Sequence, residues 1–213
     1  MYLVKTPKLI RALMPFYTWQ IATEERQLYL SFDDGPIPEV TPWVLDLLAR
    51  YNARATFFCV GENVMRHPHL YQRLLSEGHS VGNHTYNHLN GWHTEHVNYL
   101  HNVRRCQQYV RSPLFRPPYG RLMPRQRMIL EKYFRIIMWD VLSGDFDTEL
   151  SPELCFENVR DNAGPGSIVV FHDSMKAEQK LRFALPATLE YFSSQGYTFP
   201  AIPMEMTEMP EVF

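Results

Sequence analysis

Two adjacent carboxylates follow a short apolar run near the start of the chain, in the stretch Ser31-Phe32-Asp33-Asp34-Gly35-Pro36. Neighbouring residues on a strand point to opposite faces, but at a strand end, where the chain bends, two neighbouring carboxylates can be aimed into one pocket. Aspartate also favours turns, and capping of the following turn is the simpler explanation when this stretch is taken alone. A catalytic interpretation of Asp33 and Asp34 therefore depends on partners elsewhere in the chain.

Two histidines four residues apart, His84 and His88, follow another short apolar run. If the turn between them is helical, both imidazoles lie on one face and can reach one cation. Two histidines and one carboxylate leave a coordination position open for water, which is the arrangement of catalytic zinc sites. The nine histidines of the chain also give chance pairs, for which we expect surface or structural roles: His67 with His69, and His93 with His96.

Other unusual polar residues also come at the ends of apolar runs. At a strand end, Arg116 can hold a carboxylate in a fork-like pair. The proline pair after it stiffens the loop and directs the backbone N–H of Tyr119, a candidate oxyanion donor. Asp145 follows a further apolar run, and His172 ends the apolar run at residues 168–171. For His172, a hydrogen-bonded histidine in the core is the common alternative to a functional role.

Strands and helices alternate along the whole chain, which predicts parallel strands joined by helical crossovers. The strands read as apolar runs, as expected for a sheet covered by helices. Both an open sheet and a barrel fit this alternation. The polar residues at the C-terminal ends of five strands favour the barrel, because parallel α/β barrels build their active sites at that rim. Strands are expected at residues 28–34, 55–61, 80–84, 114–120, 134–141, 166–173 and 197–202. Helices are expected at residues 7–14, 41–52, 70–78, 95–110, 128–133, 151–162 and 177–194.

Length and composition indicate one globular domain spanning residues 1–213, with residues 1–24 as an N-terminal extension packed on it. The net charge of −2 gives no excess of basic residues of the kind that binds nucleic acid. No apolar run approaches the roughly 20 residues of a membrane span. The N-terminus does not resemble a signal peptide, and the three widely spaced cysteines suit a reducing compartment. We therefore expect a cytoplasmic protein without disulfides, of undetermined oligomeric state.

Together, these residues resemble the polysaccharide deacetylase family, also known as the NodB-homology domain or carbohydrate esterase family 4. The resemblance covers about residues 28–197 and rests on five short motifs in the family's order. The motifs T/S-F-D-D-G-P, H-S/T-x-x-H, R-x-P-Y, D-x-x-D-W and L-x-H correspond here to residues 31–36, 84–88, 116–119, 142–146 and 170–172. The fold that this resemblance implies is a distorted (β/α) barrel with about seven parallel strands.

The resemblance implies one divalent metal ion held by Asp34, His84 and His88. Zinc suits two histidines and one carboxylate, and cobalt, nickel or manganese fit similar geometry. Asp33 resembles the general base that acts on the metal-bound water. Arg116 is similar to the arginine that holds this base.

The remaining motifs imply the residues that complete the reaction. Tyr119 would donate its backbone N–H to the oxyanion. His172 would be the general acid that protonates the leaving amine. Asp145 matches the acid that orients this histidine and favours its charged form.

The implied activity is hydrolytic removal of N-acetyl groups from an amino sugar in a polysaccharide or oligosaccharide, such as a chitooligosaccharide or peptidoglycan. The sequence departs from the family pattern at Leu142 and Phe146, where the family has Asp and Trp, and these changes alter the wall of the acetyl pocket. Two alternatives are the same site acting on an O-acetyl ester or a non-sugar C–N bond, and a catalytically silent glycan-binding or metal-binding domain. We expect Tyr86, Trp92 and Phe146 either to be exposed and stack on sugar rings or to pack in the core.

Overall fold

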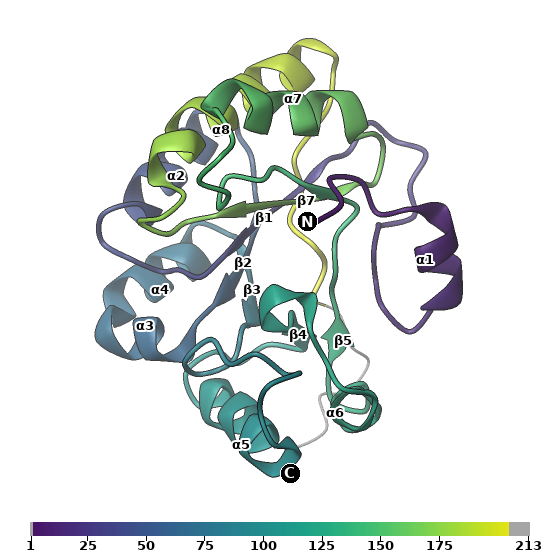
Figure 1. Ribbon diagram of the computed structural model, residues 1–213. Helices are drawn as coiled ribbons and strands as arrows, with labels where there is room; N and C mark the ends of the chain where they lie inside the picture. The colour runs from purple at the N-terminus through teal and green to yellow at the C-terminus, as the bar shows by residue number, and fades with distance from the viewer. Residues whose placement is uncertain (1, 205–213) are drawn as a thin grey trace.

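Seven parallel strands form one sheet in the computed structural model, which describes residues 2–204. The sheet has the order β5-β4-β3-β2-β1-β7-β6 and curls into a half-barrel with helices around it (Figure 1). At its centre, the wholly buried β1 (Tyr29–Asp33) pairs with both β2 (Thr56–Cys59) and β7 (Ile168–His172). The predicted distorted (β/α) barrel is therefore confirmed. The other strands are β3 (Ser80–Asn83), β4 (Leu114–Phe115), β5 (Arg135–Ile136) and β6 (Val141–Leu142).

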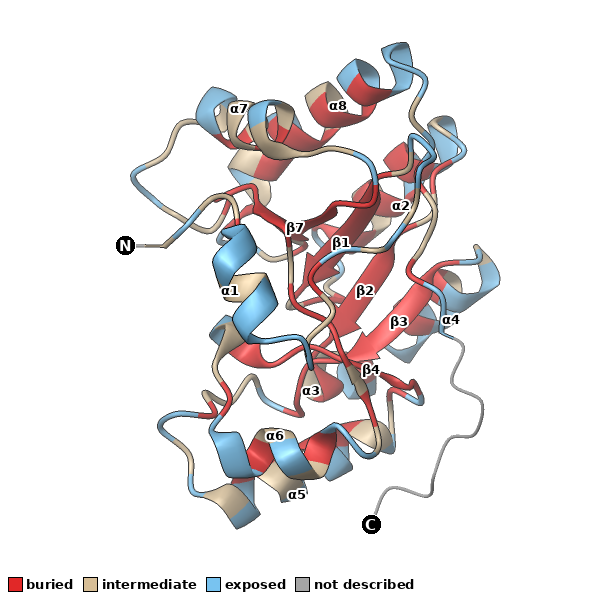
Figure 2. Cartoon of the chain, turned by 90° about the vertical axis from the view of Figure 1, so that its right-hand side faces the viewer, coloured by how far each residue is buried: buried red, intermediate tan, exposed pale blue. Residues whose placement is uncertain are grey.

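Helices surround the sheet, and most of them have a buried inner face and an exposed outer face, whereas the first helix, at residues 8–13, has no buried residue (Figure 2). Ser151 shows how one of them begins, because its hydroxyl accepts a hydrogen bond from Leu154 N, 3.2 Å away, and a proline occupies the first turn. The seven expected helices are present, and α3 is an additional short one. They are α1 (Lys8–Leu13), α2 (Thr41–Arg50), α3 (Gly61–Arg66), α4 (Pro68–Ser76), α5 (His96–Gln107), α6 (Pro124–Leu130), α7 (Pro152–Asn162) and α8 (Glu178–Ser194).

The expected strand at residues 134–141 is wrong as a single strand. It divides into β5 and β6, which lie at opposite edges of the sheet, so residues 137–140 cross the open side of the barrel. The backbone on this side finds partners outside the ladder: Thr18 N donates to Ile136 O, and Met138 N donates to Thr18 O. The expected last strand at residues 197–202 is also wrong, since it forms only an isolated bridge between Thr198 and Gln27.

The N-terminal residues lie against the β6 edge. Lys5 and Val141 form an antiparallel bridge, Leu142 N donates to Val4 O over 2.9 Å, and Thr6 N donates to Asp140 O over 2.8 Å. Figure 1 shows this start of the chain, in purple, beside β7 before it continues into α1.

The cysteines and the apolar character of the helices bear on two further expectations. The three cysteines are free and buried. Across residues 2–204, no helix has the length and apolar character needed to cross a bilayer.

Candidate active site

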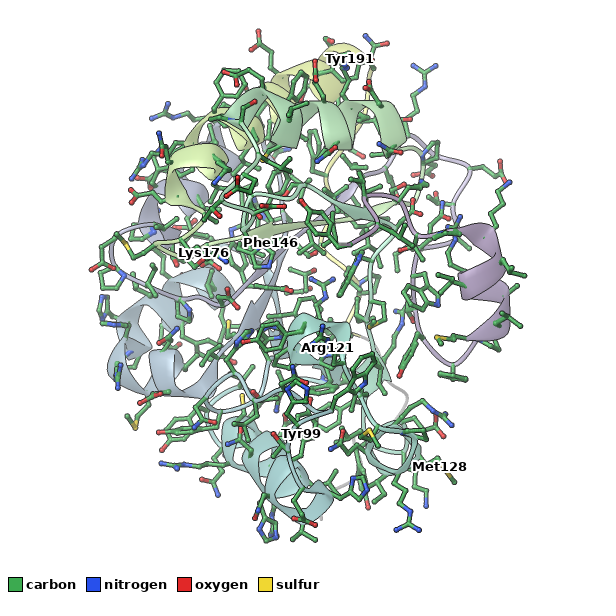
Figure 3. The ribbon with its side chains drawn as sticks, in the orientation of Figure 1. Tyr99, Arg121, Met128, Phe146, Lys176 and Tyr191 are labelled. Atoms are coloured by element: carbon green, nitrogen blue, oxygen red, sulfur yellow. The ribbon has the colours of Figure 1, made fainter. Side chains whose placement is uncertain are left out.

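A cavity of about 460 Å³ opens at the carboxyl ends of the strands. Figure 3 shows the labelled side chains of Phe146 and Lys176 on one side of this region and Arg121 on the other. Six of the eight residues predicted to bind metal or act in catalysis line the cavity: Asp33, Asp34, His84, His88, Tyr119 and His172. The other lining residues are Tyr2, Arg121, Trp139, Leu142, Phe146, Val170, Ser174 and Lys176.

Asp34, His84 and His88 bring one carboxylate oxygen and two ring nitrogens within 4.8 Å of one another. Oδ1 of Asp34 lies 3.1 Å from Nε2 of His88 and 3.7 Å from Nε2 of His84. This oxygen is buried and accepts no hydrogen bond from any residue between 2 and 204. A buried acceptor without a donor is costly unless a cation satisfies it. The donor set therefore fits a divalent ion such as zinc.

His84 is oriented as a metal ligand by its second nitrogen. Nδ1 lies 2.7 Å from the backbone oxygen of Arg116, which can only accept, so Nδ1 carries the proton and Nε2 offers its lone pair towards Asp34. Burial lowers the pKa of His84 to about 4, which keeps the ring neutral at pH 7. Burial alone would raise the pKa of Asp34, but the neighbouring histidines outweigh it and lower that pKa below its usual range. Both groups are therefore in the deprotonated form that metal binding requires.

Left-handed backbone conformations bring these ligands together. Asp34, Thr85 and His88 have φ angles of 83°, 64° and 60°. Residues other than glycine rarely adopt such angles, and they concentrate at functional sites. The turn between the two histidines is not helical: residues 84–88 form a bent loop, in which Asn83 Oδ1 accepts a hydrogen bond from Thr85 N over 2.9 Å. The histidines converge because of this loop and not through helical spacing.

Asp33 is held by Arg116, as the resemblance implied. Nη1 of Arg116 lies 2.7 Å from Oδ1 of Asp33 and also donates to Ser31 Oγ over 2.9 Å. The contact to Asp33 is a single bond and not the expected fork. The other guanidinium nitrogens donate to the backbone oxygens of Ile137 and Met138, at 3.3 and 3.0 Å, on the open side of the barrel. The fully buried Arg116 thus fixes the carboxylate of Asp33 and also holds the backbone of residues 137 and 138 on the open side of the barrel.

His172 and Asp145 form the second acid–base pair. Oδ1 of Asp145 lies 2.8 Å from Nδ1 of His172, and Oδ2 of Asp145 accepts a hydrogen bond from the backbone N–H of His172 over 2.7 Å. Burial alone would lower the pKa of His172, but Asp145 and the carboxylates of Asp34 and Asp33 raise it to about 9. The ring is thus protonated at neutral pH, with Nδ1 held by Asp145 and Nε2 available to donate a proton.

Asp173 supports the site, although no role was predicted for it from the sequence. Its Oδ1 accepts a hydrogen bond from Gly35 N over 3.1 Å, and its Oδ2 accepts one from Thr41 Oγ1 over 2.6 Å. Burial raises the pKa of Asp173 to about 8. Two signals pointed to this contact, namely the Gly-Pro pair after Asp34 and the acid directly after His172.

Gly35→Ala is expected to displace the Asp34 loop, because a Cβ at position 35 would lie 2.0 Å from Oδ2 of Asp173. We expect a loss of about 1–3 kcal/mol in the free energy of unfolding, typical of overpacking, and weaker metal binding. Denaturant titration and metal titration measure the two effects. Gly164→Ala is the matched control, since a Cβ there meets nothing within 4 Å. Equal effects of the two substitutions would contradict this role of Gly35.

The aromatic residues singled out in the sequence differ in their positions. Tyr86 is buried and packs beside Tyr109 under Arg105, which is the second of the two expected alternatives. Trp92 is exposed and lies beneath the guanidinium of Arg121. Phe146 lines the cavity, and its ring lies 5.1 Å from the ring of His172.

Known proteins share both the sequence pattern and the fold. The sequence model of the polysaccharide deacetylase family matches residues 20–133. The chain belongs to this family. A peptidoglycan-N-acetylglucosamine deacetylase of Bacillus cereus is 34% identical over 194 residues, which cover 88% of this chain and 91% of the relative.

Two further relatives extend the comparison. A chitooligosaccharide deacetylase of Azorhizobium caulinodans is 32% identical over 168 residues, covering 75% of this chain and 80% of its own. The crystal structure of a peptidoglycan N-acetylglucosamine deacetylase in complex with 4-naphthalen-1-yl-N-oxidanyl-benzamide superposes with a TM-score of 0.83 at 29% identity, covering 97% of this chain and all of that one. The recognised motifs thus belong to a family whose fold this chain shares along nearly its whole length.

Proposed function

We propose that this member of the polysaccharide deacetylase family is a metal-dependent hydrolase that removes N-acetyl groups from an acetylated amino sugar in a glycan. One observation carries the proposal: three side chains that could hold a metal ion share a cavity with Asp33 and His172, each of which is hydrogen-bonded to a buried partner, Arg116 and Asp145 respectively. The similarity to peptidoglycan and chitooligosaccharide deacetylases supports the same substrate class.

Asp34, His84 and His88 would hold the metal. When bound, a divalent ion at this place lowers the pKa of water and polarises the carbonyl group of the substrate. Asp33, kept in place by Arg116, accepts the proton of the attacking water. We assign to the backbone N–H of Tyr119 the stabilisation of the developing oxyanion, a contribution typically worth about 2.7–4 kcal/mol per donor.

His172 supplies the proton for the leaving group. An amide nitrogen cannot leave as an anion, so it must be protonated when the C–N bond breaks. Asp145 favours the imidazolium form and fixes its Nδ1, so that Nε2 is the nitrogen that donates. The two pairs thus divide proton acceptance and proton donation between them.

The floor of the cavity suits the methyl of an acetyl group. Leu142 and Val170 are register partners on neighbouring strands, and both line the cavity. Val170 lies two residues before His172 on β7, so both side chains face the same side of the sheet. An apolar floor below the proposed acid would bind the methyl group and exclude water from it.

Acetate release tests the proposal. The wild-type protein, loaded with zinc, is incubated with tetra-N-acetylchitotetraose, acetylated xylan and a cyclic ureide. We expect acetate from the chitooligosaccharide at a rate at least tenfold above that from xylan. Faster release from xylan would favour O-acetyl esters, and hydrolysis of the ureide would favour a non-sugar C–N bond. If no substrate is hydrolysed with any of zinc, cobalt, nickel or manganese, the catalytically silent alternative is correct.

A further inference from the structure

We propose that Tyr2 is a specificity-determining residue, which forms with Phe146 an aromatic wall for the sugar ring whose acetamido group is cleaved. The inference rests on the proposed function and names a residue, Tyr2, that lies outside the five motifs. The observation behind it is that a residue from the start of the chain lines the same cavity as the candidate metal ligands.

The N-terminal segment (residues 2–6) is firmly anchored in the fold. Its backbone forms an isolated antiparallel bridge with β6, between Lys5 and Val141, and two further hydrogen bonds with residues 140 and 142. Nζ of Lys5 lies 2.5 Å from Oδ2 of Asp140 and donates to the backbone oxygen of Asn162 over 2.7 Å. Asp140 is fully buried, and Arg11 also reaches it over 3.2 Å. Releasing the segment would leave a buried carboxylate without its lysine partner, so the segment is held in place.

Tyr2 and Leu3, which are neighbours at the start of this segment, differ in their exposure. Leu3 is 55% exposed, whereas Tyr2 is half-buried. Tyr2 is the residue of the two that lines the cavity. Leu3, its neighbour on the solvent side, has no part in the cavity lining.

Tyr2, Phe146 and His172 form a continuous row of rings. The ring of Tyr2 lies 5.0 Å from that of Phe146, and Phe146 lies 5.1 Å from His172, with interplanar angles of 56° and 72°. The hydroxyl of Tyr2 rests over Gly144, where a Cβ would lie only 2.9 Å from it. Gly144 has a φ of 83°, so both its conformation and this close approach require glycine.

The position of this row indicates what it contacts. His172 protonates the leaving nitrogen in the proposed reaction, so the sugar carbon that carries this nitrogen must lie beside His172. The pyranose ring then extends along Phe146 and Tyr2, whose rings offer an apolar surface for its C–H groups. Phe146 replaces the tryptophan of the family motif with a smaller ring, and Tyr2 enlarges the aromatic surface at this place.

Binding and kinetics of the zinc-loaded protein of residues 1–213 test this inference. Isothermal titration with tetra-N-acetylchitotetraose is performed in the slow Asp33→Asn background, with and without Tyr2→Ala. We expect Tyr2→Ala to weaken binding roughly 5- to 10-fold, as for loss of an aromatic contact. In the otherwise wild-type enzyme, the same change is expected to raise KM by a similar factor with kcat changed less than about twofold. Tyr2→Phe should restore both values, and Leu3→Ala is the matched control without effect.

The outcomes separate this inference from the function on which it rests. Wild-type acetate release with unchanged affinity and KM in Tyr2→Ala overturns the role of Tyr2 and leaves the proposed function intact. A fall in kcat together with a lower Tm in Tyr2→Ala shows a structural role and also overturns it. Absence of both binding and acetate release in the wild-type protein overturns the two proposals together.

Discussion

Asp33→Asn is expected to lower kcat by about 10³-fold while the protein still binds one metal ion per chain. The asparagine oxygen can still accept the hydrogen bond that Asp33 now receives from Arg116 over 2.7 Å, so the loop keeps its position. The amide cannot accept a proton from water, and a lost general base typically costs about 10²- to 10⁴-fold in rate. Acetate release and metal analysis of the purified variant measure the two quantities.

Asp34→Asn provides the contrast, because the two adjacent acids have different tasks. An asparagine is a poor ligand for zinc, and Asp34 Oδ1 is the carboxylate atom nearest to both histidines. We expect this variant to lose both metal and activity. Equal metal content in the two variants would contradict the assignment of Asp34 as ligand and Asp33 as base.

A stability measurement accompanies this comparison. Arg116 is fully buried, and Asp33 is the only carboxylate that forms an ion pair with it among residues 2–204. Asp33→Asn therefore leaves a buried cation without its counter-charge, and loss of one partner of such a pair typically costs about 3–5 kcal/mol. Activity must accordingly be measured at a temperature at which the variant is folded.

Asp145→Asn is expected to move the alkaline limb of the pH–rate profile to lower pH by at least about one unit and to lower kcat about 100-fold. Burial alone would lower the pKa of His172, and Asp145 is the strongest of the carboxylates that together outweigh burial and raise this pKa. The acid form of His172 is the active one, so the rate falls as the pH rises through this pKa. Removing the negative charge destabilises the imidazolium, which lowers the pKa and brings the fall in rate to lower pH.

The profile of kcat against pH for the wild-type and variant enzymes measures this shift. The structure gives the pKa of His172 as about 9, and the positive charge of a metal ion at Asp34 would place the limb of the loaded enzyme below that value. Glu149→Gln removes an exposed carboxylate from the same loop and is the matched control. An alkaline limb at the same pH in wild type and Asp145→Asn would show that His172 is not the acid.

The sequence was sufficient to predict the sheet, because most strands are apolar runs whose polar residues come at one end. The prediction of one strand from the sequence failed at residues 134–141, where the apolar pattern continues but the hydrogen-bond ladder of the sheet is interrupted. Thr18 and Arg116 form the hydrogen bonds that interrupt the ladder within this run, and both are distant from it in sequence. The local pattern of apolar residues therefore cannot predict these contacts. The strand expected at residues 197–202 does not form for a related reason. A strand forms only where a neighbouring strand has a free edge, and β1 is already paired on both sides with β2 and β7.

The site residues were predictable from their types and positions, whereas their geometry was not. The convergence of His84 and His88 depends on left-handed angles at Thr85 and His88, and spacing alone suggested a helical turn instead. Asp173 and Tyr2 reach the site through contacts across the fold, with Gly35 and Phe146 respectively. Such contacts become visible only when the chain has folded.

The most direct test of the central claim is acetate release by the chelator-treated wild-type protein before and after zinc is returned. We expect no measurable release from tetra-N-acetylchitotetraose after chelation, and recovery that reaches a plateau at one equivalent of metal per chain. Asp34→Asn, treated in the same way, should not recover. Full release by protein shown to contain no metal would contradict the account, since Asp34, His84 and His88 would then have no part in the reaction.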